Sequence, residues 1–499
     1  MMCRKIFVLA VALLGVVGAQ AYDFVSDGLC YNITSRVTPY TVEVTQKEQW
    51  GANYAGLTTA NIPATVVYEG NTYSVTRIGW GAFLACSDLK SVTVAASVTH
   101  IGESAFWNCD ALLSIVVENG NGVYDSRNGC NAIVETATNT LIAGCQKTVV
   151  PSDITAIGWG AFWGCRGLES ITIPAGVKHI GEGAFWACSG LKSIAVERDN
   201  SVYDSRNGCN AIVETATNTI VVGCENTTIA ANITAIGERS FYGCSGLSAI
   251  AIPDGVVSIG DGAFSGCSSL SALTIPASVT HIGELAFGGC SGLKTVTVPA
   301  SVVRMGASTF ADCASLMSVG LPEGIAAIDD GFFWGCSRLG AVTLPSTITR
   351  IGLLAFYGCS DLQSITIPAN VVRLDDWAFE DCEGLENITI YATTPPAVGT
   401  DVFGNYNATL RVPCEAREKY ASHEIFGQFS AIEADGDCPP TALETVEMAA
   451  IYAKNGRIFC SDECRIYDLL GRDVTALNGS FSGIYIVKVG EKAQKVIVK

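Results

Sequence analysis

The sequence I-G-E-S-A-F-W-N-C at residues 101–109 returns along the chain at a fixed interval and decides the fold. The recurring skeleton is I-G-x-x-A-F-x-x-C-x-x-L-x-x-(V/I)-x-(V/I)-P-x-x-(V/I). A fixed short period is typical of a solenoid, so we expect one array of stacked coils rather than several globular domains. The repeat cysteines recur at one constant step, except for two longer steps after Cys109 and Cys188, and they are Cys86, Cys109, Cys165, Cys188, Cys244, Cys267, Cys290, Cys313, Cys336, Cys359 and Cys382.

Each copy of the repeat has two halves with different periodicity. Apolar and polar residues alternate at the end of the run 168–173, which predicts a strand, and Pro174 should end it. The spacing of Ala105, Phe106 and Cys109 is typical of one face of a short helix. The predicted fold is therefore an α/β solenoid, in which each 23-residue coil consists of a strand and a short helix.

Two columns of the repeat suggest how a coil turns. We expect the glycine at Gly102 to supply a backbone conformation that is costly for other residues. The next position is acidic in seven of eleven copies, as at Glu103. A carboxylate there would offset the positive end of a helix dipole, and we expect this role rather than a ligand site.

The repeat cysteines could suggest metal or redox chemistry, but their spacing argues against it. Each cysteine falls on the same side of its coil as the repeat alanine, phenylalanine and leucine. We therefore interpret them as small buried hydrophobic residues, with disulfides between successive coils as the alternative.

The two longer steps contain insertions at 118–153 and 197–232. Residues 124–140 and 203–219 are identical, so a unit larger than one coil was duplicated. Each insertion reads as a β-hairpin. Pairing Glu135 with Thr140 places cysteines opposite each other, which predicts two disulfides, Cys130–Cys145 and Cys209–Cys224. A third candidate, across a short turn near the end of the chain, is Cys460–Cys464.

The rest of the chain divides by composition. Arg4 and Lys5 precede an apolar run and the A-Q-A sequence at 19–21, which is typical of a secretory signal peptide. Caps should cover the apolar ends of the solenoid. The predicted segments are a signal peptide at 1–21, an N-terminal cap at 22–75, repeats at 76–390, a C-terminal cap at 391–434, a linker at 435–440 and a β-sandwich-like domain at 441–499.

The charge balance excludes some partners. The chain has 30 Lys and Arg against 48 Asp and Glu, a net charge of −18. That charge repels nucleic acids and anionic membranes, and we expect no transmembrane segment in the mature chain. No catalytic motif or cofactor motif stands out from the repeat, so we expect a protein that is not an enzyme and has no cofactor.

An aromatic column is the first candidate binding surface. The residue after the repeat phenylalanine is aromatic in six of eleven copies and should point away from that phenylalanine. Such rings either stack on one another between coils or form a strip that grips a protein or a glycan. The column consists of Trp107, Trp163, Trp186, Tyr242, Trp334 and Tyr357.

A basic column is the second candidate. A zinc site is not expected, because histidines alternate with arginines and lie on distant coils. The column is either a solvated stripe that partly neutralises nearby acids or a basic track for an acidic partner. Its members directly precede the last apolar residue of the second extended piece, and they are Arg77, His100, His179, His281, Arg304, Arg350 and Arg373.

The skeleton resembles the BspA-like leucine-rich repeats from about Arg77 to Ile390, and its eleven copies make the match specific. The last domain resembles the C-terminal sorting domain of type IX secretion, through I-Y-D-L-L-G-R at 466–472 and the basic end at 495–499. It lacks the Y-P-N-P opening of that family. These resemblances imply a curved solenoid, export across two membranes, and surface display or release.

The expected function follows from the resemblance. It implies an exported adhesin that recognises a protein or glycan on host or neighbouring cells through its repeats. Residues 441–499 would engage the secretion machinery, and the mature protein would lie at the outer cell surface or outside the cell. The alternative is a structural or shielding surface protein without a specific ligand.

Overall fold

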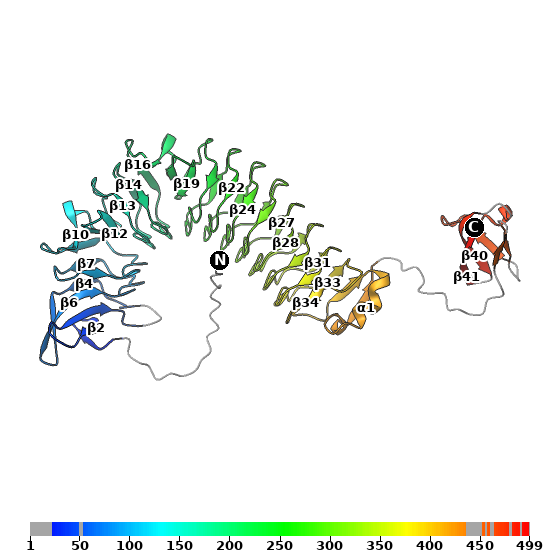
Figure 1. The fold of residues 1–499 in the computed structure, drawn as a ribbon, viewed down its shortest axis with the longest axis horizontal. Coiled ribbons are helices and arrows are strands. Elements are labelled where there is room, and N and C mark those ends of the chain that lie inside the picture. Colours follow the sequence, from blue (N-terminus) through cyan, green and yellow to red (C-terminus); the bar gives the residue numbers. More distant parts are fainter. Residues whose placement is uncertain are drawn as a thin grey trace. The chain divides into compact units, whose positions relative to one another are not determined.

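The computed structural model describes residues 22–48, 53–435, 452–454, 457–459, 464–478, 482–489 and 492–498. The predicted signal peptide and most of the predicted linker lie outside these residues. The chain divides into two compact units. The first ends at Glu433 and excludes 413–417, and the second contains 413–417 and 434–499. Within the first unit the coils follow one another in a curved row (Figure 1).

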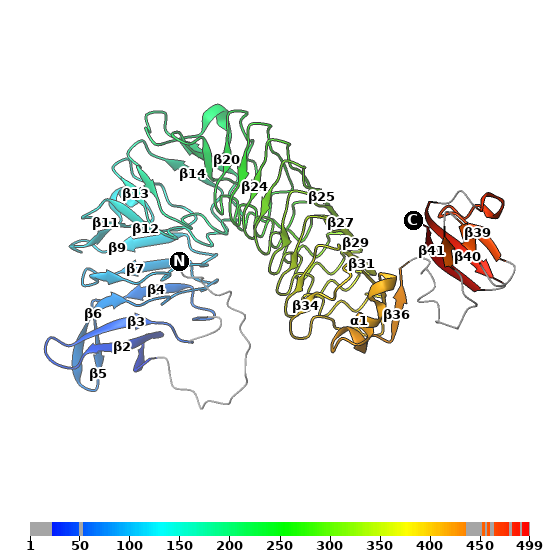
Figure 2. The ribbon, with the colours of Figure 1, turned by 45° about the vertical axis from the view of Figure 1, so that its right-hand side comes forward.

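The predicted strand of each coil is present and forms the first of two strand columns. Equivalent strands of neighbouring coils pair in parallel within several short sheets, as Ser91 with Ser114 and Ser170 with Ser193. Figure 2 shows β4, β7 and β9 side by side. The column contains β4 (Thr59–Ile62), β7 (Ser91–Val94), β9 (Ser114–Val117), β14 (Ser170–Ile173), β16 (Ser193–Val196), β21 (Ala249–Ala251), β23 (Ala272–Thr274), β25 (Thr295–Thr297), β27 (Ser318–Gly320), β29 (Ala341–Thr343), β31 (Ser364–Ile367), β33 (Asn387–Ile390), β35 (Thr409–Val412) and β36 (Ala431–Ala434).

The second column consists mainly of two-residue strands on another side of the coil. They too pair in parallel, as His281 with Arg304. The column contains β6 (Asn71–Ile78), β8 (His100–Ile101), β13 (Ala156–Ile157), β15 (His179–Ile180), β20 (Ala235–Ile236), β22 (Ser258–Ile259), β24 (His281–Ile282), β26 (Arg304–Met305), β28 (Ala327–Ile328), β30 (Arg350–Ile351), β32 (Arg373–Leu374) and β34 (Ala397–Val398).

A small antiparallel sheet covers the first coil. It contains β1 (Phe24–Ser26), β2 (Leu29–Ser35) and β3 (Thr41–Thr45), and β5 (Thr65–Tyr68) pairs antiparallel with the other edge of β6. This sheet joins the solenoid because β3 pairs in parallel with β6. The described residues after the last coil include one α-helix, α1 (Arg417–Ala421), and two 3-10 turns, η3 (Cys414–Ala416) and η4 (Phe426–Gln428).

The predicted short helix of the coil is wrong. In the described coils its place is taken by consecutive turns. Ser104 has φ 61° and Asn108 has φ 56°, and the same two columns have positive φ throughout the array. A left-handed residue at every fourth position prevents a right-handed helix from forming. The solenoid is therefore built almost entirely from strands and turns.

The reasons expected for the glycine and acidic columns are also wrong. Gly102 does not have a positive φ, but a Cβ there would lie 2.5 Å from the backbone nitrogen of Trp80 in the previous coil. Glycine therefore provides space between coils. Without a helix there is no dipole to offset. Instead, Asp261 accepts a hydrogen bond through Oδ1 from the backbone nitrogen of Glu284 in the next coil, at 2.8 Å.

Two ladders of side chains form the core of the array. Repeat phenylalanines stack ring on ring, with a centroid distance of 5.6 Å between Phe83 and Phe106. The thiol of Cys109 donates a hydrogen bond to the carbonyl oxygen of Phe83, at 3.2 Å. The repeat cysteines are buried free thiols, which confirms the prediction of burial and contradicts disulfides between coils.

Each insertion contains the predicted hairpin, and the hairpin replaces a coil in the second column. The strands are β10 (Tyr124–Asp125), β11 (Ala132–Glu135) and β12 (Thr140–Gly144) in the first insertion, and β17 (Tyr203–Asp204), β18 (Ile212–Glu214) and β19 (Thr219–Val222) in the second. The 3-10 turns η1 (Arg127–Gly129) and η2 (Arg206–Gly208) lie just before β11 and β18. Because β12 pairs in parallel with β13, the hairpin continues the column.

The predicted hairpin disulfides are wrong. Glu135 does pair with Thr140, but a bulge between Ile133 and Val134 shifts the register. The thiol of Cys145 therefore meets the backbone of Asn131, whose carbonyl oxygen lies 3.3 Å from Sγ. Cys130 and Cys145 are buried free thiols, and so are Cys209 and Cys224 in the second hairpin, which has the same bulge.

The second unit contains antiparallel strands. They are β37 (Tyr452–Lys454), β38 (Arg457–Phe459), β39 (Cys464–Tyr467), β40 (Gly483–Val489) and β41 (Lys492–Val498), with the 3-10 turn η5 (Thr475–Leu477). Cys460 lies outside the described residues, as does the side chain of Cys464, so their predicted disulfide stays a prediction. Among the residues that the structure describes, no helix has the length and apolarity needed to cross a membrane.

Candidate ligand-binding cleft

The first hairpin opens the outer turns of two neighbouring coils. In an uninterrupted pair of coils, backbone nitrogens of one turn donate to the next turn at three places, from Gly160, Phe162 and Gly164. Across the insertion one such bond remains, from Asn108 to the carbonyl oxygen of Trp163. Another has been taken over by the hairpin, because the backbone nitrogen of Gly144 donates to the carbonyl oxygen of Ala161. The two turns therefore separate along most of their length.

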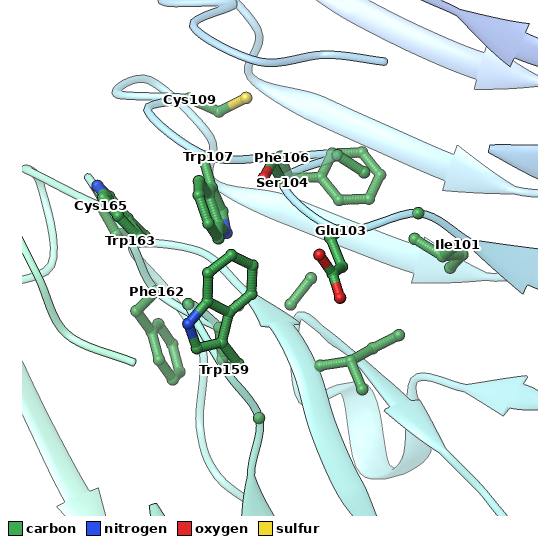
Figure 3. Close-up of a pocket in the computed structure, with 18 of the residues that line it drawn as sticks. Ile101, Glu103, Ser104, Phe106, Trp107, Cys109, Trp159, Phe162, Trp163 and Cys165 are labelled. Carbon is green, nitrogen blue, oxygen red and sulfur yellow. The ribbon is translucent and has the colours of Figure 1, made fainter. Parts of the chain in front are cut away.

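The separation leaves a cleft of about 300 Å³, which we call the first cleft. Its walls are the turn 101–109, the turn 158–165 and the hairpin strand β12. The ring of Phe162 lies against Gly144, where a Cβ would come within 2.1 Å of the ring. Figure 3 shows the carboxylate of Glu103 and three indoles around the same space.

The three indoles of the first cleft form one cluster. Trp107 stacks on Trp163 with a centroid distance of 4.0 Å and an interplanar angle of 23°. Trp159 also packs against Trp107, at 4.4 Å and 58°. Trp107 and Trp163 are half-buried, whereas 44% of Trp159 is exposed. Trp159 is therefore the ring that remains available to a ligand.

The polar groups of the first cleft are acidic and incompletely paired. Glu103 is exposed and forms no ion pair among the described residues. Glu135 accepts a hydrogen bond from the hydroxyl of Thr138, at 2.6 Å. His100 lies at the edge, and its pKa is lowered by partial burial and by the neighbouring Arg77. A lowered pKa keeps this imidazole neutral at physiological pH, so the local charge is negative.

The second hairpin produces a second cleft of about 370 Å³, lined by the other copy of the duplicated unit. Glu182 and Trp186 correspond to Glu103 and Trp107, but Glu238, Arg239 and Tyr242 stand where the first cleft has Trp159, Gly160 and Trp163. Here Arg239 forms ion pairs with Glu182 at 3.1 Å and with Glu238 at 2.6 Å. The two carboxylates of the second cleft therefore share one cation that belongs to the chain itself.

The structure brings four members of the predicted aromatic column together. Trp163 packs edge-on against Trp186 at 4.8 Å, and Trp186 packs on Tyr242 at 5.3 Å. With Trp107 they form a continuous stack along four coils. Trp334 and Tyr357 are apart from it, and in the described part of the chain neither stacks on another ring. Trp334 is 42% exposed.

The basic column lies along the second strand column, as neighbouring pairs rather than as one track. Arg77 pairs in register with His100, His281 with Arg304, and Arg350 with Arg373, whereas His179 lies beside an alanine.

Several of these cations have acidic partners. Arg77 lies 3.7 Å from Glu43, and both Arg350 and Arg373 form ion pairs with the buried carboxylate of Asp375. Over the described residues, no group of three or more His, Cys, Asp or Glu side chains could hold a metal ion.

Sequence reasoning missed Trp159, the most exposed ring of the first cleft. A signal was present, because Trp159 and Trp80 interrupt a column that is mostly acidic. A large aromatic residue at a solvent-facing polar position often marks an interface. The cleft itself has no local signal, because it exists only where a hairpin replaces a coil.

Known proteins resemble the chain in its repeats. The family described as BspA type leucine rich repeat region matches residues 65–130, 138–216, 221–340 and 327–433. No curated protein matches the chain.

Several crystal structures of leucine-rich repeat proteins also resemble it. One from Bacteroides ovatus is 27% identical, with 83% of this chain and 100% of that chain covered and a TM-score of 0.43. One from Eubacterium ventriosum is 24% identical, with 65% and 82% covered and a TM-score of 0.47. A leucine rich cell surface protein from Faecalibacterium prausnitzii is 21% identical, with 83% and 95% covered and a TM-score of 0.30.

Proposed function

The chain belongs to the BspA-type leucine-rich repeat family, and on that premise we propose that it is an exported, non-enzymatic binding protein. In this proposal it acts as an adhesin at the outer cell surface or outside the cell. Its repeat surface recognises a protein or a glycan on host or neighbouring cells.

The observation that carries the proposal is the first cleft. Trp159, exposed by 44%, lies beside Glu103, whose carboxylate forms no ion pair among the described residues, whereas the repeat phenylalanines are buried. Exposed tryptophan and tyrosine side chains supply much of the binding energy at interfaces, because a large rigid ring loses little conformational entropy. The cleft supports binding and offers no set of groups arranged for covalent chemistry.

Export rests on the two ends of the chain. The basic and apolar sequence at 1–21 supports secretion, and the strand-rich segment 441–499 supports a role as a type IX sorting domain that engages the secretion machinery. Deletion of 441–499 tests this part, with surface display measured by protease accessibility on whole cells. We expect display to be lost, and unchanged display would contradict the sorting role.

A shielding role without a specific ligand is the second candidate. The outward positions of the first strand column favour it, because Thr172, Thr297 and Thr366 give an exposed and uncharged face. Such a face is compatible with a surface coat that has no specific ligand.

Binding assays separate the two candidates. The purified mature chain is titrated on immobilised matrix proteins, glycans and whole partner cells, with circular dichroism to verify folding. If the chain is an adhesin, we expect saturable binding to at least one member of the panel. A folded chain that shows no saturable binding across the panel would favour shielding and contradict the adhesin.

A further inference from the structure

The second cleft contains its own cation. The guanidinium carbon of Arg239 lies 4.8 Å from the centre of the Trp186 ring, a cation–π contact. The Nη1 atom of Arg239 lies 3.1 Å from Oε1 of Glu182 and 2.6 Å from Oε1 of Glu238. An indole and two carboxylates thus hold one guanidinium between the turns that the hairpin separates.

The first cleft repeats this arrangement without the cation. Glu103 and Trp107 occupy the positions of Glu182 and Trp186, and Gly160 stands in place of Arg239. Trp107 leans over Gly160, where a Cβ would come within 2.5 Å of the indole. The second carboxylate is replaced by Trp159, which adds an exposed aromatic face beside Glu103.

We propose that the first cleft binds the guanidinium of an arginine side chain from a partner protein, between the carboxylate of Glu103 and the ring of Trp159. This inference rests on the proposed binding function and names the chemistry of one site within it. The partner supplies in the first cleft the group that Arg239 supplies in the second.

Charge and shape both favour an arginine. The chain carries a net charge of −18, which attracts basic partners, and neither Glu103 nor Glu135 has a cationic partner among the described residues. A guanidinium is planar, stacks on an indole and donates hydrogen bonds to a carboxylate at the same time. A lysine ammonium forms a point contact and should bind less well, whereas a neutral sugar would leave Glu103 unneutralised.

The test is a calorimetric titration of the mature chain with the peptide acetyl-Gly-Arg-Gly-amide. Its control peptide replaces arginine by citrulline, which has a similar shape without the charge. We expect one saturable site for the arginine peptide with a dissociation constant on the order of 1 mM, and at least tenfold weaker binding of the citrulline peptide. Equal binding of the two peptides, or binding of neither, would overturn the proposal.

Variants of the two clefts locate the site. Glu103→Gln and Trp159→Ala should each weaken the arginine peptide at least fivefold, whereas Glu182→Gln in the second cleft should leave its affinity unchanged. Equal effects of Glu103→Gln and Glu182→Gln would place the site elsewhere and contradict the proposal.

Gly160→Arg should supply an internal cation and abolish binding of the peptide. Its matched control is Gly331→Arg, at the same repeat position on a distant coil, where φ is 61° and a Cβ would come within 2.7 Å of the side chain of Ser308. Loss of binding in both variants would contradict the assignment to the cleft.

Failure here is distinguishable from failure of the adhesin proposal. If the chain binds a member of the ligand panel but the arginine peptide does not bind, the arginine site is wrong and the adhesin proposal stands. A glycan that binds in place of the peptide and loses affinity in Trp159→Ala would also overturn the arginine site. If neither the panel nor the peptide binds, both proposals fail.

Discussion

The first and second clefts began as copies of one duplicated unit, and their hairpins still share the identical sequence Y-D-S-R-N-G-C-N-A-I-V-E-T-A-T-N-T. Their buried halves match, since Phe162 lies over Gly144 as Phe241 lies over Gly223. Their outer turns differ. The first exposes an indole beside a glutamate that has no ionic partner in the described part of the chain, and the second holds an arginine between two glutamates.

The difference shows that the hairpin creates the space and that the next turn determines its chemistry. The residues at 159, 160 and 163 are Trp, Gly and Trp in the first cleft, and Glu, Arg and Tyr stand at the matching places in the second. None of them belongs to the core ladders. The outer turn of a coil can therefore change its side chains without a change in the fold. The predictions below test whether the two clefts share their scaffold and differ in their outer turns.

The largest expected effect concerns the shared scaffold. Gly144→Ala and Gly223→Ala should each destabilise the chain by about 1–3 kcal/mol, because an added methyl overpacks the core. The added Cβ would lie 2.1 Å and 2.0 Å from a phenylalanine ring. Urea unfolding followed by circular dichroism measures the two costs.

Gly340→Ala is the control for this pair, since its Cβ would meet nothing closer than 3.9 Å. It should be neutral or slightly stabilising. Unequal costs for Gly144→Ala and Gly223→Ala would show that the scaffolds have diverged as well.

The next effect concerns two matched thiols. Burial raises the pKa of Cys165 and of Cys244 to about 12, whereas a thiol in the unfolded chain has a pKa of about 8.5. Between these two values the thiols are protonated in the folded state and ionised in the unfolded chain. Their contribution to the free energy of unfolding is therefore fully present below about pH 8.5 and is lost as the pH rises toward 12. Each thiol contributes up to about 1.4 kcal/mol per pH unit in this window.

Cys165→Ala and Cys244→Ala should therefore reduce the alkaline loss of stability by the same amount. Unfolding free energies measured between pH 8 and pH 11 provide the slopes. A smaller slope change in one variant would break the equivalence of the two scaffolds.

The smallest effect separates the outer turns. Arg239→Ala should cost the second cleft about 0.2–1 kcal/mol, the usual range for an exposed ion pair, and the cost should shrink at high salt. Glu103→Gln should leave stability unchanged, because Glu103 has no ionic partner among the described residues. A cost of several kcal/mol for Glu103→Gln would reveal a structural role and contradict its assignment as a ligand group.

The sequence period was sufficient to predict the stacked coils, the strand of each coil and the burial of the repeat cysteines. The helix was predicted wrongly because the motif at 101–109 has Ser104 and Asn108 at the two left-handed positions, where several other copies have glycine. Those glycines were the available signal, whereas the more regular glycine at 102 serves only to let two coils approach each other.

The disulfides and the cleft could not be read from spacing. A single bulge at Ile133 moves Cys130 out of line with Cys145, and no residue type marks that bulge. The cleft depends on the hydrogen bond that the backbone nitrogen of Gly144 donates to the carbonyl oxygen of Ala161, in place of the outer turn 101–109. This contact joins segments that are not adjacent in the sequence. Of its rings, Trp107 and Trp163 were predicted as candidates from the aromatic column, whereas Trp159 belongs to the acidic column.

The two clefts should differ in the source of the cation, which is Arg239 in the second cleft and an arginine of a partner protein in the first. A crystal structure of the mature chain soaked with acetyl-Gly-Arg-Gly-amide tests it most directly. We expect a guanidinium between Glu103 and Trp159 in the first cleft, with Arg239 still against Glu182 in the second. Peptide in the second cleft with Arg239 displaced, or a first cleft without peptide at saturating concentration, would contradict an arginine site in the first cleft.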